Sequence, residues 1–400
     1  GSVFNAVMEM YADKGRSLSE DINKIVFAVP ALNGSTLVGE ILEFGIIDED
    51  YEIYRDMIPA LLGEDNVLSY AINVVLRFLP NADVHNLLDI VFDTFISDYA
   101  RYSTCLWGLC PTENYPGARA IYLEDECMKN IVPQTDWYYQ AQLDSDANIL
   151  QAIEDGVLVF DIVDYNIPLY HLVDSWDDVP ADGIIQLDST SMGAYGVNNN
   201  VKLPKDYVTP AELNNCTDPS HDHSDPRRLI DACTGLLPET TFYFYNQPHE
   251  SSASNDVFMK LASSILMDSN FTSVHSYPDV FPQFNNSRQV KGLMKDVAEM
   301  QSRDTTNLPD EYTEELNGAI KQVTEMLDNT VINTNETENA ERRFYDICEV
   351  IEAYESGELD NDEPKENNAY LDFSYLLSDL IYILSQILYV FFGGAGFSDM

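Results

Sequence analysis

Short apolar runs separated by longer polar or helical stretches mark the first two thirds of the chain. Runs rich in β-branched and aromatic residues, at 22–35, 156–166 and 240–246, are typical of buried strands. Residues 1–15 and 255–266 instead space their apolar positions at helical intervals. Residues 36–150 also have helical spacing and little strand signal. Strands that alternate with helices predict an α/β fold with a helical insertion at 36–150.

The last third of the chain has a different pattern. Residues 269–370 are predicted to form an acidic region of helices and linker, with helices near 288–303, 308–328 and 338–356. The segment 371–400 contains an apolar stretch whose polar residues recur at a seven-residue interval. This narrow polar stripe, which includes Asp379, favours an amphipathic helix over a membrane span. We expect peripheral contact with a membrane or a protein partner through 371–392.

The net charge of the chain excludes one class of binding partner. Acidic residues number 68 and basic residues 21, which gives a formal net charge of -47. Such a surface repels phosphate backbones, so no nucleic-acid partner is expected. With 45% hydrophobic and 11% aromatic residues, the chain can still bury a substantial core. No stretch has the ligand spacing of an EF-hand loop, so the acidic residues are interpreted as a solvated surface.

The cysteines do not determine the cellular compartment of the protein. Six cysteines occur without a Cys-x-x-Cys pair or the paired spacing of a zinc site, so neither a metal nor another cofactor is expected. Cys105 with Cys110, and Cys216 with Cys233, are close enough in sequence to form disulfides in an exported protein. Buried free thiols are the alternative. A secreted or cell-surface location therefore remains one option.

Two histidines in "DPSHDHSDP" raise a second metal hypothesis. His221 and His223 form a His-x-His pair, with Asp222 and Asp225 beside them. The surrounding residues are polar and typical of an exposed loop. Solvated turn residues are the preferred interpretation, and no metal is assigned to them.

The stretch "DGIIQLDSTSMG", residues 182–193, has two incompatible interpretations as a catalytic segment. Its second half resembles a Gly-x-Ser-x-Gly elbow with Ser191 as nucleophile and His249 as base, and the acid would be one of Asp222, Asp225 or Asp231. That elbow requires a helix directly after the serine, but the following residues are rich in Asn and Pro. The first elbow glycine is also replaced by Ser189. We therefore prefer the first half, the Asp-Gly pair at Asp182, as the functional element.

Several segments resemble the lipases and esterases of the α/β-hydrolase superfamily. "INKIVFAVPALNGS" is similar to the strand and loop after the nucleophile helix of these enzymes, and "GSVFNAVMEMYADKG" is similar to that helix itself. "ADGIIQLDSTSM" resembles their acid segment, and "FYFYNQPHESSASNDVFMKLASSIL" resembles their last strand, histidine loop and final helix. The resemblance covers residues 1–268, which would form the carboxyl-terminal part of an α/β-hydrolase domain.

The resemblance implies a Ser-His-Asp triad that is only partly present in the chain. Asp182 matches the acid and His249 the base, while Gly1 matches the last glycine of the elbow. The nucleophilic serine and one oxyanion donor would then precede Gly1. Each residue also has a structural alternative: Asp182 can simply begin a turn, Asp164 can be the acid instead, and His249 can be a surface or capping group.

The sequence thus predicts a partial α/β-hydrolase fold with a helical cap insertion and an acidic, mostly helical tail. The implied function is that of a serine lipase or carboxylesterase acting on a lipid or small ester, in which the present chain is inactive without its serine. The alternative is a non-catalytic surface or envelope protein that uses a hydrolase-like body as an interaction platform.

Overall fold

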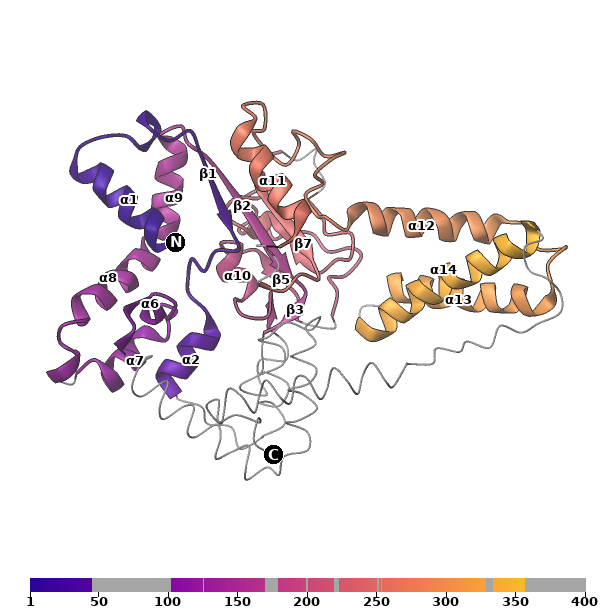
Figure 1. Cartoon of the computed structure of the whole chain (residues 1–400), viewed down its shortest axis with the longest axis horizontal. Helices are drawn as coiled ribbons and strands as arrows, with labels where there is room; N and C mark the ends of the chain where they lie inside the picture. Colours follow the sequence, from indigo (N-terminus) through magenta and orange to yellow (C-terminus); the bar gives the residue numbers. More distant parts are fainter. Residues whose placement is uncertain are drawn as a thin grey trace, which may run out of the picture. The chain divides into compact units, whose positions relative to one another are not determined.

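A computed structural model describes most of the chain: residues 1–44, 102–124, 126–169, 179–198, 201–218, 223–249, 252, 254–328 and 334–356. Much of the insertion, at 45–101, and the terminal segment 371–392 lie outside these residues. The chain divides into two compact units, Gly1–Asp48 with Ile90–Glu349 and Glu49–Asp89 with Val350–Met400. The description below concerns the first unit, together with residues 350–356, which complete its last helix. It has a mixed α/β architecture with a small parallel sheet, which confirms the predicted class (Figure 1).

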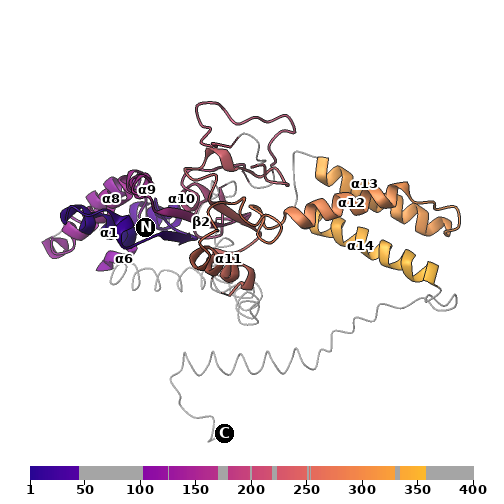
Figure 2. The same ribbon diagram turned by 90° about the horizontal axis from the view of Figure 1, so that it is seen from above.

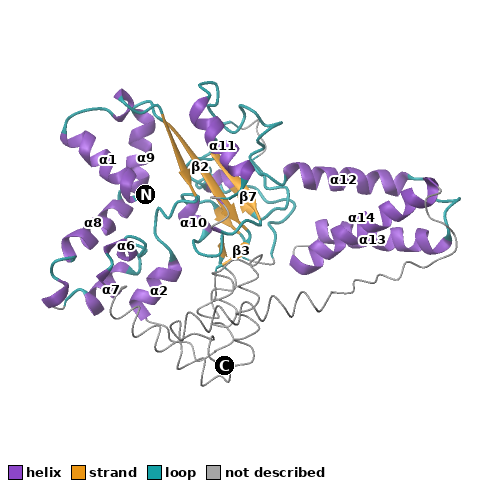
Figure 3. Cartoon of the chain, in the orientation of Figure 1, coloured by secondary structure: helices purple, strands orange, loops and turns teal. Residues whose placement is uncertain are grey.

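The sheet consists of the three strands that the apolar runs predict. They are β1 (Lys24–Ala28), β2 (Leu158–Tyr165) and β7 (Thr241–Tyr245), adjacent in this order and all parallel (Figure 3). Phe27 of β1 pairs with Asp161 of β2, which pairs with Thr241 of β7. Since all three strands run in the same direction, the loops that follow them leave from one edge of the sheet.

Helices α1 (Ser2–Asp13) and α9 (Ser145–Glu154) pack on one face of this sheet. Phe4 and Met8 of α1 and Ile149 of α9 form a buried cluster with Phe27 and Val159 of the strands. Residues that alternate along β2 point to opposite faces, so Val159 faces this cluster and Phe160 the other side.

Helix α11 (Asp256–Met267) covers the opposite face. Phe258 and Leu261 pack there against a cluster that includes Phe160 and Phe242. The amino end of α11 is capped by Asn255, whose side chain accepts from two backbone amides. At the other end Lys24 Nζ donates to the carbonyls of Ile265, Asp268 and Phe271, at 2.9, 2.6 and 2.5 Å. The ammonium group therefore satisfies carbonyls at and just beyond the end of the helix.

The described part of the insertion between β1 and β2 is helical, as predicted. A short 3-10 turn precedes α8, and a second one precedes β1, outside the insertion. The elements are η1 (Leu18–Glu20), α2 (Thr36–Phe44), α6 (Thr104–Trp107), α7 (Tyr115–Tyr122), η3 (Glu126–Met128) and α8 (Val132–Leu143). Apart from η1, they share a buried cluster around Trp107 and Tyr115.

The connection from β2 to β7 is a long, mostly irregular segment with short elements. These are β3 (Ile167–Pro168), β4 (Pro180–Ala181), α10 (Leu187–Thr190), β5 (Tyr195–Gly196), β6 (Ile230–Asp231) and η5 (Ala232–Thr234). A disulfide joins Cys216 to Cys233 and closes a loop of this segment. Cys105 on α6 is exposed and Cys110 is buried, and neither forms a disulfide. Of the two disulfides considered from the sequence, only Cys216–Cys233 forms.

The predicted carboxyl-terminal helices are present as α12 (Ser287–Ser302), α13 (Asp310–Asp328) and α14 (Thr334–Ser356). Both views show the three helices alongside one another (Figure 2). Helix α12 buries an apolar stripe that contains Val290, Leu293 and Val297. In the described part of the chain, no helix combines the length and the apolar character that crossing a bilayer requires.

Candidate functional site

The side chains of Asp182 and His249 meet at the carboxyl edge of the sheet. His249 Nδ1 lies 2.8 Å from Asp182 Oδ2, and the backbone N–H of His249 donates to the carbonyl of Asp182 at 2.9 Å. Asp182 follows β2 after the short strands β3 and β4, and His249 follows β7. The expectation that these two residues lie within hydrogen-bonding reach is confirmed. Their catalytic role stays a prediction.

The carboxylate of Asp182 is held rigidly. Its residue is 1% exposed, and Oδ1 accepts hydrogen bonds from the backbone amides of Ile184 and Ile185 at 3.0 and 2.8 Å. Gly183 has a φ of +98°, a conformation that glycine adopts without strain and that lets the chain turn tightly here. Asp182 is therefore both a turn residue and the partner of His249, because each function uses a different carboxylate oxygen.

Asp182 also sets the tautomer of His249. A carboxylate can only accept a hydrogen bond, so Nδ1 of His249 must carry the proton that it shares with Oδ2. In the neutral ring Nε2 is then the nitrogen with the lone pair. The side chain of His249 is 32% exposed, whereas that of Asp182 is fully covered. The site thus combines a reachable base with a buried orienting group.

The other acid considered from the sequence does not occupy this position. Asp164 lies inside β2, paired with Phe244 of β7, and is 1% exposed. The strand continues to Tyr165, so Asp164 belongs to the sheet and not to the loop beyond it. Asp182 is the carboxylate that the structure brings to His249.

Ser191 is arranged as a structural residue, consistent with its rejection as nucleophile. It is 1% exposed, and its hydroxyl donates to the carbonyl of Leu187 and accepts from the amide of Ala194. The short helix α10 precedes Ser191 instead of following it. The acids considered as triad partners of Ser191 also have structural contacts. Asp225 accepts hydrogen bonds from the backbone amides of Arg227 and Leu229. Asp231 accepts from Tyr207, Thr209 and Cys233, and Asp222 lies outside the described residues.

The interpretation of His223 as a solvated turn residue is wrong. His223 is buried at 5% exposure, with Nδ1 2.9 Å from Gln283 Oε1 and Nε2 3.4 Å from Glu239 Oε2. His275 Nε2 contacts the same Glu239 oxygen at 2.8 Å. The polar local sequence gave no sign of this, because the partners of His223 come from distant segments. His221 lies outside the described residues.

The segment 182–189, which begins at Asp182, is called the acid loop. Side chains that the sequence analysis did not single out connect it to the loop after β1 by hydrogen bonds. Ser35 Oγ donates to the carbonyl of Ile184 at 2.6 Å, and the amide of Thr36 donates to Gln186 Oε1 at 3.0 Å. Ser189 Oγ accepts from the amide of Asn33 and donates to the carbonyl of Gly34. These contacts fix the segment that follows Asp182 relative to the loop after β1.

A cavity of about 690 Å³ lies beside the acid loop and is lined by residues that include Gln186, Asp188 and Tyr195. Neither Asp182 nor His249 lines it. The dyad itself can move a proton: a neutral imidazole held by a buried carboxylate is a general base for a hydroxyl nucleophile. Comparison with known protein families, with curated proteins and with solved structures finds no match for this chain.

Proposed function

We propose that this chain is the carboxyl-terminal part of an α/β-hydrolase of the serine lipase or carboxylesterase class, and that Asp182 and His249 are two members of its triad. The single observation that carries the proposal is the 2.8 Å contact between His249 Nδ1 and the buried Asp182 Oδ2. In such hydrolases the acid and the base stand on loops after successive strands, in the chain order Ser, Asp, His. Here the two residues follow the adjacent parallel strands β2 and β7 in that order.

The position of the first helix supports the same proposal. A Cβ built on Gly1 would lie 3.2 Å from Leu32 Cδ2 and 3.6 Å from the carbonyl of Ala31, so the amino end of α1 lies against the loop after β1. That loop is bonded to the acid loop through Ser35 and Ile184. A residue directly ahead of Gly1 would therefore lie at the same edge of the sheet as the dyad. In our proposal the nucleophilic serine comes from that upstream sequence.

The proposed reaction is acyl transfer from an ester. The serine attacks the ester carbonyl while His249 Nε2 takes up its proton, and the resulting imidazolium then gives a proton to the leaving alkoxide. Asp182 keeps Nδ1 protonated and stabilises the positive charge on the ring. Water repeats the sequence on the acyl-enzyme. The substrate class is a lipid or small ester.

The proposal can be tested with a polypeptide that carries the natural sequence upstream of Gly1. A fluorophosphonate probe, which modifies activated serines, should label one serine that precedes Gly1, as located by peptide mass spectrometry. Asp182→Asn should lower kcat for a nitrophenyl ester on the order of 10⁴-fold, because the histidine then holds the wrong tautomer. Ser191→Ala is the matched control and should retain turnover.

Two results would contradict this proposal. Labelling of a serine within residues 1–400 would move the nucleophile into the chain, and turnover that survives His249→Ala would remove the base. A folded, extended polypeptide with neither labelling nor turnover would favour the non-catalytic interaction platform.

A further inference from the structure

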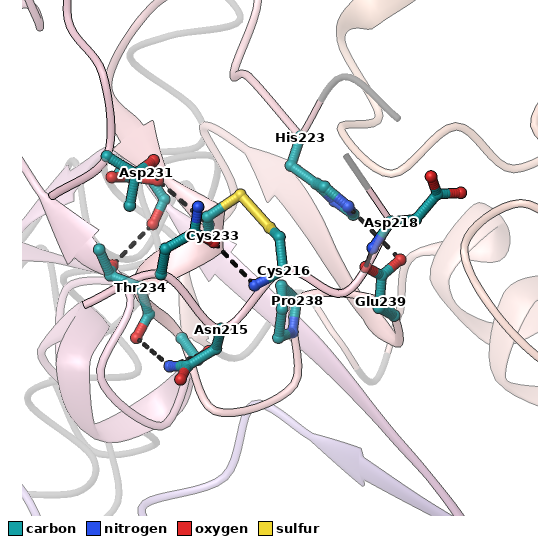
Figure 4. The surroundings of a disulfide bond; sticks show 12 residues. Asn215, Cys216, Asp218, His223, Asp231, Cys233, Thr234, Pro238 and Glu239 are labelled. Carbon is teal, nitrogen blue, oxygen red and sulfur yellow. Dashed lines mark hydrogen bonds and ion pairs between the residues drawn. A yellow bond between two sulfur atoms is a disulfide. The ribbon is translucent and has the colours of Figure 1, made fainter. Parts of the chain in front are cut away.

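Cys216, His223 and Glu239 converge beside the Cys216–Cys233 disulfide, and we name these three residues the Cys-His-Glu cluster (Figure 4). One ligand atom from each residue, the Cys216 sulfur, a ring nitrogen of His223 and a carboxylate oxygen of Glu239, lies within 4.8 Å of the other two. His223 is buried, and the others are partly buried. The cluster is separate from the Asp182–His249 pair and shares no residue with it.

Gln283 determines which ring nitrogen of His223 faces Glu239. The amide nitrogen of Gln283 donates to the carbonyls of Pro238 and Thr241 at 2.8 and 3.1 Å. These two bonds orient the amide so that Oε1 faces His223 Nδ1, which must then be the protonated ring nitrogen. When the ring is neutral, the lone pair is on Nε2, which lies 3.4 Å from Glu239 Oε2. Two electron-pair donors that face each other in this way are suited to share a cation.

Glu239 is fixed in place by hydrogen bonds. Its Oε1 accepts from the backbone amides of Thr217 and Asp218, each at 3.0 Å, and its Oε2 accepts from His275 Nε2 at 2.8 Å. Such outer-shell donors orient a carboxylate ligand.

We propose that the Cys-His-Glu cluster is a zinc site that is masked by the Cys216–Cys233 disulfide and opens when this disulfide is reduced. A sulfur in a disulfide carries no charge and is a poor ligand, whereas a thiolate binds zinc strongly. Thiolate, imidazole and carboxylate are the ligand types that zinc takes in proteins. Three protein ligands leave a fourth tetrahedral position for water.

The redox step balances with a dithiol as reductant. The dithiol gives two electrons and two protons to the Cys216–Cys233 bond and becomes a disulfide itself, and Cys216 and Cys233 become thiols. Zinc then displaces the proton of Cys216 and joins Sγ, His223 Nε2 and Glu239 Oε2. A small-molecule disulfide reverses both steps: it takes up the two electrons and becomes a dithiol, the Cys216–Cys233 bond forms again, and the metal is released. The oxidised and the zinc-bound states therefore exclude each other.

The surroundings of the cluster allow a metal to arrive. A cavity of about 400 Å³ is lined by both His223 and Cys233, together with acidic residues such as Asp225 and Asp231. Zinc ligands at roughly 2.0–2.3 Å from the metal must be closer to one another than 4.8 Å. Breaking the disulfide frees the Cys216 side chain to make this small approach.

The test uses the full 400-residue chain and zinc alone as the probe. Cys233→Ala leaves Cys216 as a free thiol without any reductant, and calorimetric titration should give one zinc per chain. The oxidised wild-type chain should bind zinc at least on the order of 100-fold more weakly, since it lacks one ligand and outer-shell losses alone cost about 10- to 100-fold. Cobalt(II) should give a sulfur-to-metal charge-transfer band with Cys233→Ala only.

Cys216→Ala/Cys233→Ala is the matched control, because it keeps the acidic surface and the other cysteines but removes the proposed sulfur ligand. Circular dichroism checks that each variant is folded. Should Cys233→Ala fail to fold, wild-type chain reduced with a dithiol and then desalted replaces it, and reoxidation should release the zinc. Equal zinc affinity in the oxidised chain and in Cys233→Ala, or a charge-transfer band in the double variant, would overturn the proposal.

Discussion

His249 Nδ1 and Asp182 Oδ2 are 2.8 Å apart, although 67 positions separate the two residues in the sequence. The contact joins a partly exposed imidazole to a fully covered carboxylate, whose other oxygen is engaged by two backbone amides. Asp182 therefore cannot rotate toward solvent without losing these bonds. This relationship makes the tautomer of His249 a property of the fold.

Asp182→Asn should move the ring proton of His249. The asparagine oxygen can still accept from Ile184 and Ile185, so its amide nitrogen faces the imidazole, and Nδ1 must then accept a hydrogen bond. Nitrogen-15 NMR of labelled histidine should report protonation at Nδ1 in the wild type and at Nε2 in the variant. The exposed Asp206→Asn should leave the His249 spectrum unchanged. An unchanged spectrum in Asp182→Asn would contradict the assigned tautomer.

Gly34→Ala should destabilise the loop after β1. Gly34 has a φ of +70°, and an added Cβ would lie 2.5 Å from the carbonyl oxygen of Leu109 and 2.8 Å from Pro111 N. Both the backbone strain and the clash with main-chain atoms cost free energy, about 2–4 kcal/mol in total. Denaturant unfolding measures this loss. Gly292→Ala in α12, where nothing lies within 4 Å, should instead stabilise by about 0.5–1 kcal/mol.

Asp161→Val should make the protein more stable at neutral pH. Asp161 is fully buried in β2, and among the described residues no side chain forms a hydrogen bond with its carboxylate oxygens. Burial raises the pKa of this group well above its ordinary 3.8. A raised acid pKa means that the folded state holds the proton longer, so stability declines as the pH rises above 3.8.

The Asp161→Val variant removes this pH-dependent loss. Its free energy of unfolding should exceed that of the wild type by about 1–3 kcal/mol at neutral pH, and the gain should shrink in mild acid. Urea titrations at both pH values measure the difference. A destabilised Asp161→Val at neutral pH would indicate that the carboxyl group has a favourable role.

Glu239 should stabilise the fold above its ordinary pKa and lose that effect in acid. Because the pKa falls from 4.5 to about 2 on folding, the contribution is present above pH 4.5 and disappears as the pH drops toward 2. Because Glu239 is partly exposed, solvent screening limits its contribution to the free energy of unfolding to on the order of 1–2 kcal/mol. The difference in unfolding free energy between wild type and Glu239→Gln should narrow across this range. An equal narrowing in Glu212→Gln, at an exposed position, would point to a general charge effect.

Local patterns were sufficient to locate the main elements. The apolar runs predicted β1, β2 and β7, and helical spacing predicted α1, α11 and the helices of the last third. Burial of one face imposes these periodicities on neighbouring residues, so they can be read without knowledge of the tertiary contacts. The choice of Asp182 and His249 as partners came instead from the resemblance of their segments to those of α/β-hydrolases, and their catalytic role stays a prediction.

Contacts between distant segments could not be predicted from the sequence. Nothing local distinguishes Glu239, His275 or Gln283 as partners of His223, since each comes from a different part of the chain. Both candidate cysteine pairs were also close enough in sequence to form a disulfide, and only Cys216–Cys233 forms. The sequence by itself determined which segments become strands and helices, because hydrophobic burial acts on each segment's own periodicity. Only the tertiary structure decided which polar groups are buried together, because that depends on how the segments pack in space.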